Sequence, residues 1–181
     1  MSLDTQNEMK TVQGSTRVET LPPQARFSLR ARAESIDELG RALGVELPQK
    51  IGRRESVGER DVLCLGPDEW LVTAPESEAG NIGSALAAIY ETTPHSLSNI
   101  SDRELSVMLD GPDALTLLSM GCPRDLERLP VGAAVRTIFD NASVILWRDG
   151  EQRFRMDIWR SFAPHAVELL HIGQAELRAG L

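Results

Sequence analysis

The same order of strand and helix patterns occurs twice along this chain, and that repeat constrains its fold more than any other feature. The first half covers about residues 26–91 and the second about residues 104–173. Each half reads as strand, helix, strand, strand and helix. A single repeat unit of roughly 80 residues, linker included, would bury little of its sheet alone, so the two are expected to pack together. We therefore predict a single α+β domain over residues 18–177, built from two β-α-β-β-α pseudo-repeats.

Hydrophobic periodicity predicts the elements of the first half. Residues 26–33 alternate between apolar and polar side chains, which is typical of a strand with one buried face. Ser35 and Glu38 have the spacing of a capping box, so a helix is expected to begin there and to end at Gly44. The remaining elements expected in this half are a hairpin and a second helix, over residues 61–65, 70–74 and about 78–91.

The second half repeats the pattern. Residues 104–110 alternate in the same way, and Pro112 stands at the favoured first position of a following helix. A last helix is expected from about Ser161 to His171. Three further strands are expected between these helices, over residues 134–139, 142–147 and 153–159.

Composition and charge limit the partners that this chain could bind. It has 181 residues, with 19 Lys and Arg against 27 Asp and Glu, which gives a net charge of −8. A field of this sign repels phosphate backbones, so we expect no nucleic-acid partner. The 41% share of hydrophobic residues is that of a globular protein with a core rather than of a disordered chain.

The N-terminus and the cysteines bear on location. The first eight residues have neither a basic region nor an apolar run, so no secretory signal is expected, and the polar residues 1–17 are expected to form a mobile tail. No apolar run approaches the ~20 residues that a membrane-spanning helix needs, so no membrane insertion is expected. Cys64 and Cys122 form neither a disulfide framework nor a zinc pattern. A cytoplasmic protein is therefore expected.

The sequence lacks the motifs of common catalytic sites. GxSxG, HExxH, phosphate-binding lysine loops and GxGxxG are all absent. His165 and His171 are six residues apart on one predicted helix, so they would point to nearly opposite faces and could not share a metal. Cys122 follows a helix, so it lacks the helix N-terminus that activates reactive thiols. We therefore expect no catalytic, cofactor-binding or metal-binding residues in this chain.

Five short motifs stand out, and the resemblance that they carry covers roughly residues 20–175. They are Leu65-Gly66-Pro67-Asp68-Glu69-Trp70-Leu71, Gly121-Cys122-Pro123, Leu129-Pro130-Val131-Gly132, Arg136-Thr137 and Trp159-Arg160-Ser161-Phe162. Taken together and in this order, they resemble the gamma subunit of heterotetrameric sarcosine oxidase. The resemblance implies a fold similar to the folate-binding domain of the glycine-cleavage aminomethyltransferase. Each motif also has a structural interpretation, such as a turn at Gly66 and Pro67 and a core position for Trp70 and Trp147.

The resemblance implies a non-catalytic subunit of a bacterial complex. Such a complex oxidises sarcosine to glycine, passes the released one-carbon unit to tetrahydrofolate and produces hydrogen peroxide. The implied partners are the alpha, beta and delta subunits. FAD, FMN, NAD and zinc are implied in those partner subunits, with no cofactor in this chain.

A free-standing folate-binding protein or one-carbon enzyme of the same fold is the alternative. One folate-binding branch of this fold, which assists iron–sulfur assembly, carries a Lys-Gly-Cys-aromatic-x-Gly-Gln-Glu signature. Here Gly121-Cys122 follows Met120 and precedes Pro123, so the signature is absent. This absence favours an interaction subunit, which would cover and stabilise the surfaces of cofactor-bearing subunits.

The last predicted strand offers a candidate partner surface. Alternation places Phe154 and Ile158 on its apolar face, so that Arg155 and Trp159 project from the other face. Trp and Arg are enriched in interface hot spots, which makes Arg155, Trp159 and Arg160 candidate partner contacts. Two alternatives for Trp159 are cover by the C-terminal helix and simple exposure.

Overall fold

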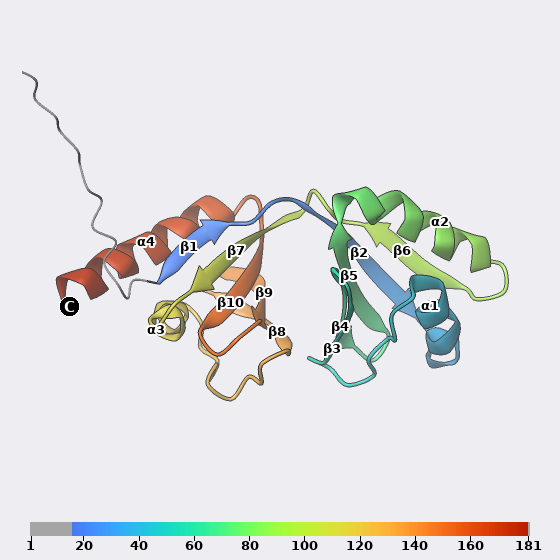
Figure 1. The fold of residues 1–181 in the computed structure, drawn as a ribbon, viewed down its shortest axis with the longest axis horizontal. Helices are drawn as coiled ribbons and strands as arrows, with labels where there is room; N and C mark the ends of the chain where they lie inside the picture. The colour runs from blue at the N-terminus through green and yellow to red at the C-terminus, as the bar shows by residue number, and fades with distance from the viewer. Residues whose placement is uncertain (1–15, 181) are drawn as a thin grey trace, which may run out of the picture.

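The computed structural model describes residues 16–180, which form two five-stranded antiparallel sheets with helices on their outer faces (Figure 1). The N-terminal sheet has the strand order β3-β4-β5-β2-β6, and the C-terminal sheet has the order β1-β7-β10-β9-β8. Most of the tail predicted over residues 1–17 lies outside the described residues.

The bounds of the elements are as follows. The N-terminal sheet and its helices comprise β2 (Gln24–Ala31), the 3-10 helix η1 (Ala33–Ser35), α1 (Ile36–Leu43), β3 (Arg54–Val57), β4 (Arg60–Gly66), β5 (Glu69–Pro75), η2 (Glu76–Glu78), α2 (Ala79–Ile89) and β6 (His95–Asn99). The C-terminal sheet and its helices comprise β1 (Arg17–Thr20), β7 (Glu104–Asp110), α3 (Ala114–Ser119), β8 (Ala134–Phe139), β9 (Ala142–Arg148), β10 (Arg153–Trp159) and α4 (Ala163–Ala179).

The molecule has four layers, because each sheet is covered by helices on one face and meets the other sheet on its opposite face (Figure 1). Leu39 of α1 and Leu86 of α2 belong to the core over the N-terminal sheet, and Leu117 of α3 and Leu170 of α4 belong to the core over the C-terminal sheet. A smaller core lies between the sheets and consists of Leu63, Leu71, Ala134, Ile145 and Trp147. The central strands therefore have two buried faces, as sheets covered on both sides do.

The two sheets have the same strand order when their strands are matched in turn. The strands β3, β4, β5, β2 and β6 correspond to β8, β9, β10, β7 and β1. The edge position beside β2 or β7 is filled differently in the two sheets. In the N-terminal sheet it is filled by β6, which follows α2, whereas in the C-terminal sheet it is filled by β1, which precedes β2 in the chain. Strand β1 pairs with β7 from Arg17↔Asp110 to Thr20↔Val107. The chain therefore passes from one sheet to the other after β1 and again after β6 (Figure 1).

The mixed helix and strand fold expected from the sequence is confirmed, and β7, β8 and β10 have the predicted bounds. Strand β2 ends at Ala31 rather than at residue 33, because residues 33–35 form the 3-10 helix η1. The Ser35 side chain makes no capping hydrogen bond, so the predicted capping box does not form. The prediction ended the last helix at His171, whereas α4 continues to Ala179, and it missed the short edge strands β1, β3 and β6.

The two tryptophans predicted to fill the core do so. Trp70 is 1% exposed and donates from Nε1 to the carbonyl oxygen of Pro48 at 2.7 Å, while Trp147 is fully buried between the sheets. None of the helices within residues 16–180 is long and apolar enough to cross a membrane.

Candidate functional site

The face between the two sheets carries a buried network of polar side chains. Arg26 of β2 and Asp157 of β10 form an ion pair with 3.2 Å between Nη2 and Oδ1, and both side chains are almost completely buried. Asp157 also accepts hydrogen bonds from Trp147 Nε1 at 2.7 Å and from the Ser106 hydroxyl. Because burying a charge is costly unless it is paired and hydrogen-bonded, these partners stabilise the charges at the seam between the sheets.

Arg155 belongs to the same seam, although the sequence marked it as a candidate partner contact. It is 6% exposed, and its guanidinium pairs with Asp61 of β4 at 3.2 Å and with Asp149 at 3.4 Å. The guanidinium also lies over the Trp147 ring, 4.4 Å from the ring centroid. The predicted alternation of β10 is right, but the face that it assigns to Arg155 meets the N-terminal sheet. Arg155 therefore joins the two sheets of this chain instead of offering a free surface.

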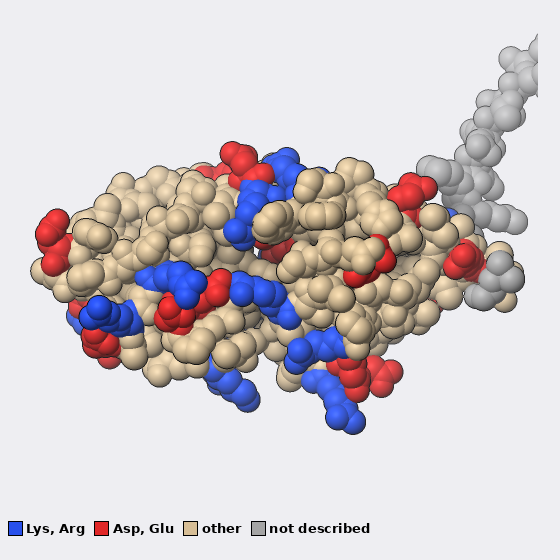
Figure 2. Space-filling view, turned by 180° about the vertical axis from the view of Figure 1, so that it is seen from behind, with Lys and Arg blue, Asp and Glu red and all other residues tan. Residues whose placement is uncertain are grey.

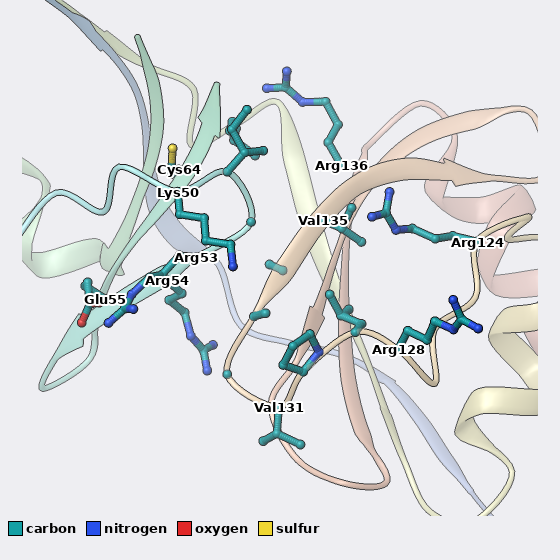
Figure 3. A pocket seen from close by; sticks show the side chains of 18 of the residues that line it. Lys50, Arg53, Arg54, Glu55, Cys64, Arg124, Arg128, Val131, Val135 and Arg136 are labelled. Atoms are coloured by element: carbon teal, nitrogen blue, oxygen red, sulfur yellow. Dashed lines mark hydrogen bonds and ion pairs between the residues drawn. The ribbon is translucent and has the colours of Figure 1, made fainter. Parts of the chain in front are cut away.

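A basic pocket of about 720 Å³ opens where the loop before β3 faces the segment that leads into β8 (Figure 3). One wall is formed by residues 50–55 and the other by residues 124–136. Six cationic side chains line the pocket, namely Lys50, Arg53, Arg54, Arg124, Arg128 and Arg136. Figure 3 shows Lys50 extending from the first wall toward the second. We refer to this site as the basic pocket.

The two walls meet through a short antiparallel contact. Arg53 and Ala133 form an isolated β-bridge, and the amide of Ala134 donates to the carbonyl oxygen of Gly52 at 3.0 Å. Gly52 and Gly132 have φ values of +85° and +84°, which L side chains rarely adopt. A Cβ on Gly52 would lie 3.0 Å from the carbonyl oxygen of Ala134. Both positions therefore favour glycine for its positive φ, and at Gly52 the absence of a Cβ also allows the two loops to approach each other closely.

Carboxylates compensate some of the pocket's cations but not all of them. Arg53 pairs with Glu55 at 2.7 Å, Arg128 with Asp125 at 3.0 Å and Arg136 with Glu69 at 2.5 Å, and Arg54 pairs with Asp149 at the seam. Within residues 16–180, Lys50 and Arg124 have no carboxylate partner. Both side chains are exposed, so they are available to an anionic group that enters the pocket.

Sequence reasoning missed this pocket. Its cations come from two segments about 70 residues apart, and a chain with a net charge of −8 gives no sign that they gather. One signal was available, because Leu129-Pro130-Val131-Gly132 and Arg136, which carry part of the family resemblance, line the pocket. Figure 2 shows Lys and Arg side chains concentrated near the middle of the molecule, where the two halves meet.

Trp159 ends β10 and Arg160 follows it, and neither residue lines the basic pocket. Trp159 is 45% exposed, so α4 does not cover it, and the Arg103 guanidinium lies 5.5 Å from its ring centroid. Arg160 is exposed and donates from Nε to the carbonyl oxygen of Asp102 at 2.8 Å. Phe162, which follows closely in the chain, is 44% exposed. These residues form an exposed patch with aromatic and cationic side chains.

The titratable groups of the described residues form no metal-ligand cluster. Residues 16–180 contain no group of three or more His, Cys, Asp or Glu side chains placed to hold a metal ion. Cys64 and Cys122 are buried free thiols, and burial raises the pKa of Cys64. His165 is exposed and lies 2.8 Å from Asp140, and its hydrogen bond lowers the pKa of that carboxyl group.

A family model and the curated relatives of this chain identify one family. The model of the sarcosine oxidase gamma subunit family matches residues 31–176. The sarcosine oxidase subunit gamma of Corynebacterium sp. (strain P-1) is 36% identical over 135 residues, which are 73% of this chain and 66% of that protein. The chain thus matches slightly less than two thirds of the length of that relative.

Two solved structures extend these comparisons to the fold. A chain of the heterotetrameric sarcosine oxidase from Corynebacterium sp. U-96, in complex with pyrrole 2-carboxylate, matches with a TM-score of 0.80 and 30% identity, over 89% of this chain and 84% of that chain. Aminomethyltransferase T of the glycine cleavage system from Bartonella henselae matches with a TM-score of 0.67 and 14% identity, over 87% of this chain and 45% of that one. At that identity the second match shows the fold alone, and it confirms the fold expected from the sequence.

Proposed function

Because the chain belongs to the sarcosine oxidase gamma subunit family, we propose that it is the non-catalytic gamma subunit of a heterotetrameric sarcosine oxidase. The observation that carries this proposal is the structural match to a chain of such a complex. That match has a TM-score of 0.80 and covers 89% of this chain. The family resemblance inferred from the five sequence motifs is thereby confirmed.

The proposal assigns the chemistry to the other subunits. In the complex, sarcosine would be oxidised to glycine with transfer of the one-carbon unit to tetrahydrofolate and formation of hydrogen peroxide. The alpha, beta and delta subunits would hold FAD, FMN, NAD and zinc. This chain would contribute surface, because residues 16–180 hold no cluster of metal-ligating groups and its buried ion pairs, Arg26–Asp157 and Arg155–Asp61, join its own two sheets.

The exposed patch at the end of β10 is one surface that we assign to partner contact. Trp159 and Phe162 expose large aromatic surfaces, and Arg103 and Arg160 provide charged groups beside them. Buried aromatic and Arg side chains contribute most of the energy of many protein interfaces. Of the three residues that the sequence suggested, Trp159 and Arg160 therefore remain in the proposal, while Arg155 acts within the chain.

Co-expression tests the proposed role. The chain would be produced with the alpha, beta and delta subunits of a heterotetrameric sarcosine oxidase, with an affinity tag on another subunit. We expect this chain to co-purify with the tagged subunit in equal molar amount. The purified complex should show flavin absorbance and should form peroxide when sarcosine is added. The chain produced by itself should be colourless and should form no peroxide above a buffer control. Failure to co-purify would contradict the subunit role, and peroxide from the chain alone would contradict the non-catalytic role.

The folate-binding alternative has its own test. Calorimetric titration of the chain with tetrahydrofolate should show only weak binding, since the folate-branch signature is absent around Gly121-Cys122 and the net charge of −8 disfavours an anionic ligand. Micromolar or tighter affinity would favour the free-standing folate-binding protein instead.

A further inference from the structure

The basic pocket concentrates positive charge in an acidic protein. Six of the chain's 19 Lys and Arg residues line one pocket, although the net charge of the whole chain is −8. We propose that this pocket is a docking site for an acidic segment of a partner subunit. The inference rests on the proposed function, because it names the surface through which the gamma subunit would hold part of its complex.

The first argument is the charge that remains available. Lys50 and Arg124 have no carboxylate partner within residues 16–180 and come from different walls, so each could bind a carboxylate without breaking an existing ion pair (Figure 3). The pairs at Arg53, Arg128 and Arg136 are exposed, and such pairs contribute little to stability. Carboxylates of a partner could therefore replace or join them at small cost.

The second argument is the apolar surface beside these charges. Ile51 is 61% exposed and Val131 is 48% exposed, and each lies next to one of the pocket's two glycines of positive φ. Exposed aliphatic side chains at the rim make no favourable contact with a small inorganic anion. Apolar groups next to Arg side chains are instead typical of protein interfaces. The expected ligand is thus a peptide segment with carboxylates and apolar side chains.

The third argument is the shape of the site. A volume of about 720 Å³ lies within the range of roughly 300–1,000 Å³ that is usual for binding pockets, and it can take several side chains. The β-bridge between Arg53 and Ala133 fixes the two walls before any partner arrives. A preformed site needs less ordering on association, which favours affinity. Nucleic acid fits the pocket's charge but is repelled by the acidic remainder of the molecule.

Charge reversal in the assembled complex tests the docking site. The chain carrying Lys50→Glu and Arg124→Glu would be co-expressed with the three other subunits, and the amount retained on a tagged partner would be measured at increasing salt. Like charges placed across an interface are strongly unfavourable, so we expect retention to fall at least about tenfold. The neutral variant K50Q/R124Q should give an intermediate loss. Added hexaglutamate peptide should displace the wild-type chain more effectively than inorganic phosphate at the same total charge.

A matched control separates local charge from total charge. Arg32→Glu with Arg178→Glu makes the same change in net charge at two exposed positions that do not line the pocket, and this variant should be retained like the wild type. Equal retention of both double variants would overturn the docking site while leaving the proposed function intact. Displacement by phosphate as strong as that by hexaglutamate would also overturn it, since a simple anion site would then explain the pocket. A wild-type chain that fails to assemble would contradict the proposed function itself.

Discussion

Arg26 and Asp157 are 131 residues apart in the sequence, yet their side chains form an ion pair of 3.2 Å that is buried between the two sheets. The pair joins β2 of one sheet to β10 of the other. Ser106 and Trp147 hydrogen-bond the same carboxylate, so the charge of Asp157 is compensated from three directions. This contact adds to the small apolar core and to the Arg155 ion pairs that hold the two sheets together.

Removing one member of this pair should destabilise the chain strongly. Asp157→Ala leaves Arg26 charged and buried without its partner, which typically costs about 3–5 kcal/mol. Asp68→Ala removes the exposed pair with Arg30, which water screens, and should cost far less. Urea denaturation of the two variants measures both free energies of unfolding. Similar losses in both would show that burial between the sheets adds nothing to the importance of the Arg26–Asp157 pair.

Trp159→Ala should weaken assembly and leave the chain itself nearly as stable. Because Trp159 is already 45% exposed, its loss should lower Tm by no more than about 2–4 °C, the shift expected for 1 kcal/mol in a chain of this size. An interface hot spot would lose at least about 2 kcal/mol of binding energy in the complex. Trp147→Ala is the control, because removing this fully buried side chain should lower the free energy of unfolding by about 3–5 kcal/mol. A large fall in Tm for Trp159→Ala would refute the interface role.

The two glycines of the basic pocket allow a matched comparison. Gly52→Ala and Gly132→Ala place an alanine at nearly the same positive φ, which costs roughly 1–2 kcal/mol. Only at Gly52 does the new Cβ meet a backbone atom, the carbonyl oxygen of Ala134 at 3.0 Å. Gly52→Ala should therefore be the more destabilising of the two in denaturant titrations. The reverse order would mean that the contact between the two walls tolerates an additional methyl group.

The Asp140–His165 pair predicts a specific pH dependence. The hydrogen bond from His165 lowers the pKa of Asp140 below its ordinary value of 3.8. A carboxyl group with a lowered folded pKa stabilises the protein above its unfolded pKa, and this contribution is lost as the pH falls through the folded value. The wild type should therefore lose a small increment of stability below about pH 4 that Asp140→Asn lacks. NMR titration of His165→Gln should show the pKa of Asp140 rising, and an unchanged pKa would contradict the assignment.

The regular elements of the fold could be predicted because their sequences alternate clearly. Strand β10 is an example, since Phe154, Met156 and Ile158 are all fully buried on the helix-covered face. The missed strands β1, β3 and β6 have a different character. They are edge strands of four or five residues with few buried side chains, so most of their stabilisation comes from backbone pairing that hydrophobic periodicity does not report.

The roles of individual surface residues were harder to predict, because they depend on how the two sheets face each other. Alternation correctly separated Arg155 from the apolar face of β10, but it could not say that a second sheet would cover that opposite face. The basic pocket was hidden for the same reason. Lys50 and Arg124 line one pocket because the two sheets pack face to face, with a backbone contact between Gly52 and Ala134 across the seam.

The placement of β1 also has a consequence for synthesis on the ribosome. This strand is made before the other described strands, but its partner β7 begins only at Glu104, after the whole N-terminal sheet has been made. Residue Thr16, just before β1, already contacts α4, since its carbonyl oxygen accepts a hydrogen bond from Gln174 Nε2 at 2.6 Å. A circular permutant that joins α4 to β1 and begins at β2 would make each sheet from one continuous stretch of chain. Such a permutant would remove the delay between the synthesis of β1 and its pairing.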